Sequence, residues 1–167
     1  MKGLFIQMTG LSGSGKTTLA NKTAEKLKKD GYKVEIIDGD EYRLGLCSDL
    51  GFTREDRNTN IRRLGFVGRV LARNGVIAIM SAINPYEEIR NEIEGELVFV
   101  NCKIETAIDR DVKGLYAKAL SGEIKNFTGI SDPFEIPQKP ATTITTDNED
   151  LEISADKLYN FILSRIK

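Results

Sequence analysis

The sequence contains no histidine, and this absence removes several kinds of chemistry at once. A Ser-His-Asp triad, zinc held by histidine and a histidine general base are all excluded. Only two cysteines are present, Cys47 and Cys102, and they form neither a metal-binding nor a disulfide pattern. Such sparse cysteine usage suits a reducing compartment. No apolar run approaches the roughly 20 residues that a membrane-spanning helix needs.

The sequence also has little net charge, because 24 Lys and Arg residues stand against 25 Asp and Glu residues. This balance does not favour a nucleic-acid or membrane partner, and basic groups are expected only locally, at a phosphate site. The first residues lead directly into an apolar segment and lack the cleavage site of a signal peptide. We therefore expect a cytoplasmic protein. A chain of 167 residues is expected to form one domain over residues 1–167.

The most informative segment is GLSGSGKT, which begins at Gly10 and fits the pattern G-x-x-x-x-G-K-[ST]. Its glycines allow successive backbone N–H groups to turn toward one anion. A buried strand is predicted before it, over 4–8, and a helix after it, over about 16–30, whose positive end favours a phosphate. Lys16 would then reach the β- and γ-phosphates of ATP, and the Thr17 hydroxyl would ligate Mg²⁺. The residues expected to bind the nucleotide are Gly10, Ser12, Gly13, Ser14, Gly15, Lys16, Thr17 and Thr18.

Strands and helices alternate along the rest of the chain, and the apolar run at 76–80 suits a parallel strand covered on both faces. The order predicts an α/β protein with a doubly wound parallel five-stranded sheet, whose ligands bind at the carboxyl ends of the strands. The further strands are predicted over 34–37, 76–80, 97–100 and 142–145, and the further helices over 53–73, from Pro85, from 104 to 111 and over 151–166.

Two acids, Asp38 and Asp40, follow the second predicted strand and are separated by one glycine. Many P-loop ATPases hold their metal with an acid at the end of the third strand, but here that strand ends in Ser81. Asp40 is therefore the acid expected beside Mg²⁺, which it would share with Thr17, and beside the attacking hydroxyl. Asp38 could serve instead, and the sequence does not separate the two. An ordinary turn after a strand is the alternative interpretation.

A charged run extends from Arg54 to Arg63. On a helix, Arg57 and Asn60 share a face. Arginine suits phosphate and sulfate oxygens, and an asparagine amide can contact a ribose or a base edge. The alternative interpretation is a solvated helix face that carries ion pairs.

The segment over about 110–137 places glycines and polar residues around Tyr116, Phe127 and Phe134. Long segments of this kind in a compact domain are usually functional or disordered, and the three aromatic residues argue against disorder. We expect a mobile lid that closes over a ligand. The residues alone thus indicate an ATP- and Mg²⁺-dependent phosphotransferase with an acceptor pocket.

Taken in order, the motifs resemble those of the adenylylsulfate (APS) kinase family over most of the chain. The matching segments are GLSGSGKTT, DGD with Arg43 three residues further on, DLGF followed by DRNTNIRR, RDVKGLY, and IKNFTGISDPFEIP. The resemblance implies a P-loop kinase with a mobile lid that phosphorylates the 3′-hydroxyl of adenosine 5′-phosphosulfate. It implies that Asp40 is the acid near the acceptor hydroxyl and the metal. Together with the phosphate loop, the expected catalytic residues are Asp40, Lys16 and Asp38, with Asp38 as the alternative to Asp40. The resemblance also implies that Phe52 and Phe127 stack on the two faces of the acceptor base. The implied acceptor-binding residues are Arg43, Phe52, Arg57, Asn60, Lys113 and Phe127, and Arg110 joins the residues that bind ATP.

Some positions depart from the family pattern. The usual I-S-P-Y segment is here Ile83-Asn84-Pro85-Tyr86, which lacks the serine that some members phosphorylate, and Leu120 replaces a usual arginine. Aromatic stacking accepts any base, so another nucleotide acceptor, such as cytidine diphosphoramidate, is an alternative. A non-catalytic nucleotide-binding switch is a further alternative, but the chain lacks the N-K-x-D guanine signature. The expected partner is a small-molecule nucleotide, and the oligomer considered is a homodimer.

Overall fold

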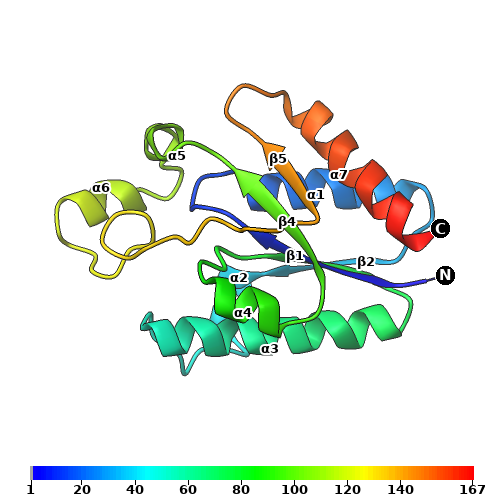
Figure 1. Cartoon of the computed structure of the whole chain (residues 1–167), viewed down its shortest axis with the longest axis horizontal. Coiled ribbons are helices and arrows are strands. Elements are labelled where there is room, and N and C mark those ends of the chain that lie inside the picture. Colours follow the sequence, from blue (N-terminus) through cyan, green and yellow to red (C-terminus); the bar gives the residue numbers. More distant parts are fainter. Residues whose placement is uncertain (1) are drawn as a thin grey trace.

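Five parallel strands form one sheet in the order β2-β3-β1-β4-β5 (Figure 1). The structure is a computed structural model that describes residues 2–167. The strands are β1 (Leu4–Thr9), β2 (Val34–Asp38), β3 (Ile77–Ser81), β4 (Glu96–Asn101) and β5 (Thr142–Thr145). The predicted α/β fold with a doubly wound parallel five-stranded sheet is confirmed.

Helices cover both faces of this sheet. Helices α1 and α7 pack on one face, and α3 packs on the other with α4 beside it (Figure 1). The helices are α1 (Lys16–Lys29), α2 (Gly39–Leu44), α3 (Arg54–Arg73), α4 (Glu87–Glu92), α5 (Ile104–Arg110), α6 (Leu115–Leu120) and α7 (Leu151–Ile166). Among residues 2–167, none of these helices combines the length and the apolar character needed to cross a bilayer.

The ends of α3 are where the sequence places them. The Thr53 hydroxyl accepts a hydrogen bond from the Asp56 amide at 3.1 Å, and two acids occupy the first turn. The helix ends at Arg73, and Gly75 follows with a φ of 76°, a left-handed conformation that costs glycine little.

The short helices α2 and α6 were not predicted. The start of α4 was also misplaced, because the helix begins at Glu87 and not at Pro85.

Alternate residues of β1 enter two apolar clusters, one on each face of the sheet. Ile6 belongs to the cluster under α1 and α7, whereas Phe5 belongs to the cluster under α3 and α4. Successive strand residues point to opposite faces, so this strand is apolar on both sides except at Gln7 and Thr9. All five residues of β3 are buried, which confirms the prediction of a strand covered on both faces.

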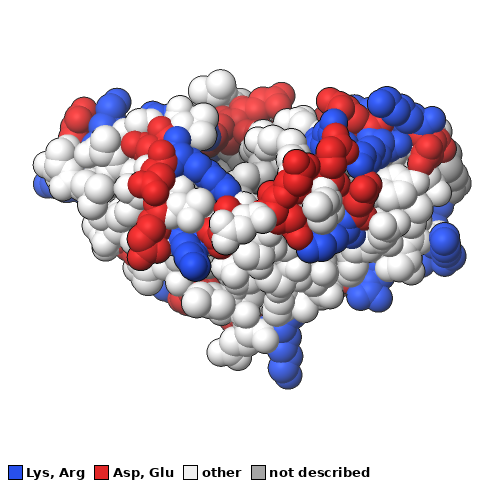
Figure 2. Space-filling model, turned by 90° about the horizontal axis from the view of Figure 1, so that it is seen from above, with Lys and Arg blue, Asp and Glu red and all other residues white. Residues whose placement is uncertain are grey.

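Two acidic side chains of α7 form ion pairs with lysines of α1. Lys22 and Lys26 lie 2.5 and 2.9 Å from the Glu152 carboxylate, and Lys26 also lies 2.6 Å from Asp156. Figure 2 shows basic and acidic side chains interspersed on the face that is seen from above. Such exposed pairs each contribute little to stability. The buried apolar contacts are therefore the main source of stability.

The carboxyl ends of the strands meet at one edge of the sheet, and the irregular segments gather there. In Figure 1, α5, α6 and the yellow segment after α6 project from this end of the molecule. This places the predicted lid, over about 110–137, beside the loop between β1 and α1. Whether the lid moves stays a prediction.

We expect Leu64→Ala to destabilise the protein by about 2–5 kcal/mol, because Leu64 is fully buried between α3 and the sheet. Phe66→Ala on the same helix is the matched control, since the Phe66 side chain is 59% exposed. Its effect should stay within about 0.5 kcal/mol. Urea denaturation of both variants measures the difference in free energy of unfolding. Equal effects would contradict this assignment of the core.

Candidate active site

A cavity of about 690 Å³ opens at the carboxyl edge of the sheet. This volume is in the range typical of small-molecule sites. The loop before α1, helices α2 and α3, the loop after β3 and the lid all contribute to its lining. All the residues predicted for the site line this cavity except Gly10 and Ser14. The structure therefore brings together residues that are spread from the first strand to the lid.

The glycine-rich loop before α1 has the tight backbone that its sequence predicts. Gly13 and Gly15 have φ angles of 77° and 96°, in the left-handed region that favours glycine. A Cβ on Gly10 would lie 2.4 Å from the Val100 carbonyl oxygen, so any larger residue would displace the backbone. No side chain caps the N-terminus of α1. Its first N–H groups are therefore suited to bind an anion.

Lys16 is buried, and its ammonium is held by the loop that precedes it. Its Nζ atom donates to the carbonyl oxygens of Gly10 at 2.8 Å and Leu11 at 2.7 Å. Burial, assisted by the charge of Lys113, lowers the pKa of Lys16 to about 7. An anion in the cavity would favour the charged lysine and oppose this effect.

Three oxygen atoms meet at the first turn of α1. The Thr17 hydroxyl lies 3.0 Å from an Asp38 carboxylate oxygen and 3.0 Å from the Ser81 hydroxyl. The other Asp38 oxygen accepts hydrogen bonds from the amides of Asp40 and Glu41, which caps α2. Asp38 and Ser81 are register partners in β2 and β3, which explains why they meet. The sequence identified Ser81 only as the end of a strand, and its place beside Thr17 depends on the strand pairing.

Asp40 points to a different part of the cavity. Its carboxylate forms an ion pair with Lys113 of the lid, and both side chains are more than half exposed. Asp38 is therefore the acid that contacts Thr17, while Asp40 faces the lid. The catalytic role of either acid stays a prediction.

The far side of the cavity presents an exposed aromatic ring between two arginines. The guanidinium carbons of Arg43 and Arg57 lie 4.4 and 5.5 Å from the centre of the Phe52 ring. Burial and the charge of Arg57 lower the pKa of Arg43. Asn60 is buried at the same wall, and its side-chain oxygen has no hydrogen-bond partner among the described residues. This wall can bind an anion together with a flat ring.

The charged run on α3 divides into two kinds of residue. Arg62 and Arg63 form ion pairs at 2.6 Å with Glu92 and Asp49, as the solvated-face alternative predicts. Arg57 instead donates to two backbone carbonyls, those of Phe52 at 3.0 Å and of Asn126 in the lid at 2.6 Å. Arg57 lines the cavity, and its contact with an acceptor stays a prediction.

The lid contacts the glycine-rich loop through Tyr116. The Tyr116 hydroxyl donates to the Ser12 carbonyl at 2.7 Å, and burial raises the pKa of Tyr116 to about 12, which keeps the hydroxyl protonated. Phe127 is also buried and packs edge-on against the Tyr116 ring, with 5.0 Å between ring centres. The sequence marked Tyr116 only as a lid aromatic. Its contact with the loop is a tertiary feature.

Arg110 ties α5 to the same loop. It donates to the Gly13 carbonyl at 3.1 Å and to the Thr146 carbonyl at 2.7 Å. The Thr146 hydroxyl in turn donates to the Ser14 carbonyl at 2.7 Å. Arg110 also lines the cavity, and its predicted contact with ATP stays a prediction. Thr146 was not identified from the sequence.

The fold and the site define a P-loop protein of the α/β class with a cavity for a phosphorylated ligand. Residues 2–145 match the family described as adenylylsulphate kinase, and the chain belongs to this family of kinases. The adenylyl-sulfate kinase of Rippkaea orientalis is 51% identical over 163 residues, which cover 95% of this chain and 90% of the relative. That of Chloroflexus aurantiacus is 53% identical over 161 residues, which cover 93% of this chain and 87% of the relative.

A solved structure has the same fold. It is the APS kinase of Mycobacterium tuberculosis in complex with AMPPNP and APS, which is 36% identical to this chain. The alignment covers 97% of this chain and 98% of that one, with a TM-score of 0.93. The predicted family resemblance is confirmed.

The low pKa of Lys16 makes the free energy of unfolding depend on pH. Between pH 7 and the pKa of an unfolded lysine, which is 10.5, the unfolded state binds more protons than the folded state, so stability rises with pH. Relative to Lys16→Met, which lacks this group, the wild type should gain up to about 1.4 kcal/mol per pH unit over pH 7–9.5. Denaturation without nucleotide measures both proteins. A difference that is independent of pH would show that Lys16 has an ordinary pKa.

Proposed function

We propose that this protein phosphorylates the ribose 3′-hydroxyl of adenosine 5′-phosphosulfate with ATP and forms 3′-phosphoadenosine 5′-phosphosulfate. One observation carries the proposal: the phosphate-binding loop and the arginine-flanked Phe52 ring line one cavity. A donor phosphate and a flat acceptor can therefore be held in the same enclosed space. The curated relatives are named adenylyl-sulfate kinases, and the similar solved structure holds both AMPPNP and APS.

The donor side of the cavity binds and neutralises phosphate. Phosphoryl transfer requires mainly positioning and electrostatic stabilisation, because the negative charge is spread over oxygen atoms. The N–H groups at the start of α1 face a region that would receive the β- and γ-phosphates. Lys16 would exchange its bonds to the Gly10 and Leu11 carbonyls for bonds to phosphate oxygens, and would then be fully protonated.

The oxygen atoms of Thr17, Asp38 and Ser81 suit Mg²⁺, which prefers hard oxygen ligands. Among residues 2–167, no group of three or more Cys, Asp and Glu side chains is arranged to hold a metal. A site with one carboxylate fits Mg²⁺, which usually keeps several waters and binds substrate phosphates. When bound, Mg²⁺ would offset the charge of the phosphates. Thr17 and Asp38 would hold it directly or through water, and Asp40 is the alternative acid.

The acceptor side of the cavity holds the base and the charged 5′ group. Arg43 and Arg57 would bind the phosphosulfate oxygens, since a guanidinium can make two parallel hydrogen bonds to such groups. Phe52 would stack on the base from the α2–α3 side and Phe127 from the lid, with Asn60 at its edge. Lys113, which now pairs with Asp40, would turn to the phosphates and leave Asp40 to orient the 3′-hydroxyl. Arg110 would contact ATP from α5.

The remaining expectations are part of the same proposal. A single domain over residues 1–167, closure of the lid, a cytoplasmic location and a homodimer stay predictions. The same is true of the absence of nucleic-acid and membrane partners.

An assay of ADP release across acceptors tests the function. The kcat/KM for APS should be more than about tenfold higher than the kcat/KM for cytidine diphosphoramidate or for plain nucleotides. This corresponds to a difference of about 1.4 kcal/mol or more in barrier height. Mass spectrometry and removal of the new phosphate by a 3′-nucleotidase identify its position on the product. Lys16→Ala serves as the inactive control. A preference for the cytidine acceptor would overturn the substrate, and turnover by Lys16→Ala within about tenfold of wild type would overturn the phosphate clamp.

Substitution of Asp38 and substitution of Asp40 should change different kinetic quantities. Asp40→Asn should lower kcat by about 100-fold with an unchanged Mg²⁺ requirement, because in the proposed complex Asp40 would orient the acceptor hydroxyl. Asp38→Asn should instead raise the Mg²⁺ concentration needed for half-maximal activity, because a negative charge beside Thr17 is lost. Titrations of Mg²⁺ at saturating ATP and acceptor distinguish the two. The opposite pattern would exchange the roles of Asp38 and Asp40.

A further inference from the structure

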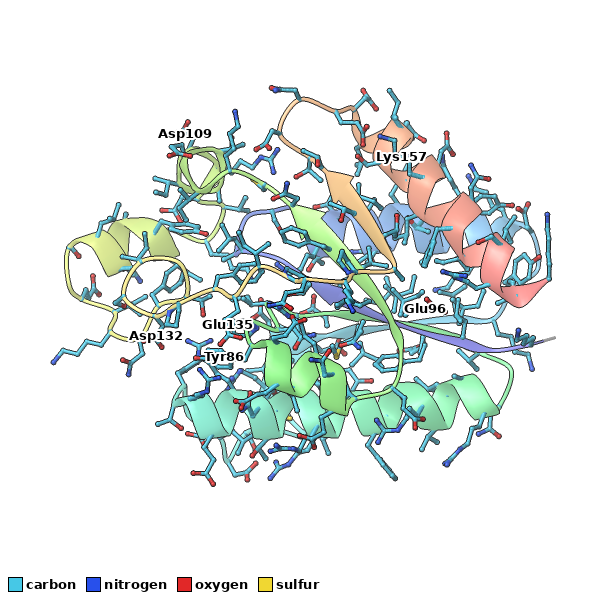
Figure 3. All side chains as sticks on the ribbon, in the orientation of Figure 1. Tyr86, Glu96, Asp109, Asp132, Glu135 and Lys157 are labelled. Carbon is cyan, nitrogen blue, oxygen red and sulfur yellow. The ribbon has the colours of Figure 1, made fainter. Side chains whose placement is uncertain are left out.

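The lid returns to the body of the protein at Phe134 and Glu135, close to the start of α4. We propose that Glu135 is a positioning residue, which fixes this return point and thereby places the lid over the acceptor side of the cavity. The inference rests on the proposed function, since it concerns the binding of the acceptor. In Figure 3, Glu135 and Tyr86 are labelled close together at the base of the lid, with Asp132 further into the lid.

Glu135 supplies the cap that α4 lacks. Tyr86 is the N-cap residue of α4, and its side chain makes no capping hydrogen bond. Instead, one Glu135 carboxylate oxygen accepts a hydrogen bond from the Glu87 amide at 2.9 Å. The Glu135 amide in turn donates to the Pro85 carbonyl at 2.9 Å. A single lid residue thus holds the chain on both sides of Tyr86, and a carboxylate is the group that a helix N-terminus favours.

The neighbouring Phe134 makes this attachment rigid. Its ring stacks on Phe99 of β4, with 6.1 Å between ring centres, and lies 5.2 Å from the guanidinium carbon of Arg90. The Arg90 side chain is fully buried and donates to the Asn84 carbonyl at 2.8 Å and to Glu87 at 2.9 Å. The return point of the lid is therefore joined to the sheet, to α4 and to the loop before α4.

The same attachment reaches the acceptor wall. Residues 82–85, which precede Tyr86, line the cavity. Glu88 of α4 accepts hydrogen bonds from Asn58 at 2.7 Å and Arg54 at 3.0 Å, on the helix that carries Arg57. Glu135 therefore connects the lid to two parts of the acceptor wall. Phe127 lies in the lid between this attachment and the bond from Arg57 to the Asn126 carbonyl.

Among the contacts of the Glu135 carboxylate, the hydrogen bond from the Glu87 amide is the one that holds the lid to α4. The contact between Arg54 and Glu135 is 3.3 Å long and both side chains are more than one-third exposed, so it contributes little. A glutamine keeps an oxygen that can accept from the Glu87 amide but loses the charge. Glu135→Gln should therefore preserve the attachment, whereas Glu135→Ala removes it.

The test combines acceptor kinetics with hydrogen exchange in the full-length protein. Glu135→Ala should raise the KM for APS at least about fivefold, with the KM for ATP and kcat within about twofold of wild type. Amide exchange at Glu87 and in residues 126–137 should become at least about tenfold faster. Glu135→Gln should stay within about twofold of wild type in every readout. The matched control is Glu123→Ala. The Glu123 side chain is exposed in the lid and forms no hydrogen bond or ion pair with residues 2–167, so this substitution should have no effect.

Two results would overturn the proposal. One is a Glu135→Ala variant that matches Glu123→Ala in exchange and in acceptor KM. The other is a Glu135→Gln variant as impaired as Glu135→Ala, which would assign the effect to charge. The exchange measurement needs no substrate, so it tests the attachment even if APS were not the acceptor. Thermal unfolding of each variant separates loss of the attachment from loss of the fold.

Discussion

The glycine-rich loop between β1 and α1 is the constraint on which the rest of the site depends. Three successive carbonyl groups of this loop each accept a hydrogen bond from a different part of the chain. The carbonyls are those of Ser12, Gly13 and Ser14, and their donors are Tyr116, Arg110 and Thr146. The lid, α5 and the end of β5 are thus organised around this loop. A change in the loop backbone would displace all three, and glycine at Gly10 is required because Val100 leaves no room for a Cβ.

A second constraint is the placement of two arginine side chains at the cavity, neither of which forms an ion pair among residues 2–167. Arg43 and Arg57 flank the Phe52 ring, and their proximity contributes to the lowered pKa of Arg43. Three other arginines of α3, namely Arg54, Arg62 and Arg63, form ion pairs with carboxylates. Arg43 and Arg57 line the cavity, where cations that form no ion pair would stabilise a bound anion, and this supports the proposed acceptor wall. The same reasoning applies to Lys16, whose burial favours the neutral form until an anion is present.

Much of the fold could be predicted from the sequence, because its signals are local. Four apolar runs and one short threonine-rich segment predicted five strands, and the Thr53 cap with the Asn74-Gly75 stop predicted the ends of α3. Local signals failed at the short elements. Helix α2 depends on the Asp38 carboxylate as its cap, α6 is a short helix within a segment of loop-like composition, and α4 begins after Tyr86 with a cap from the distant Glu135. A cap supplied from a distant residue leaves no pattern in neighbouring residues.

The sequence by itself determined the phosphate-binding loop, the parallel α/β order and some of the residues that line the cavity. These depend on residue type and spacing along one element, such as Arg57 and Asn60 on one face of a helix. Only the tertiary structure decided that Asp38 and not Asp40 contacts Thr17, and that Ser81 joins them. The pairing of β2 with β3 brings Asp38 and Ser81 together, and Asp40 pairs instead with Lys113 of the lid. Contacts between distant segments depend on strand order and packing, which the spacing of residues within one segment does not encode.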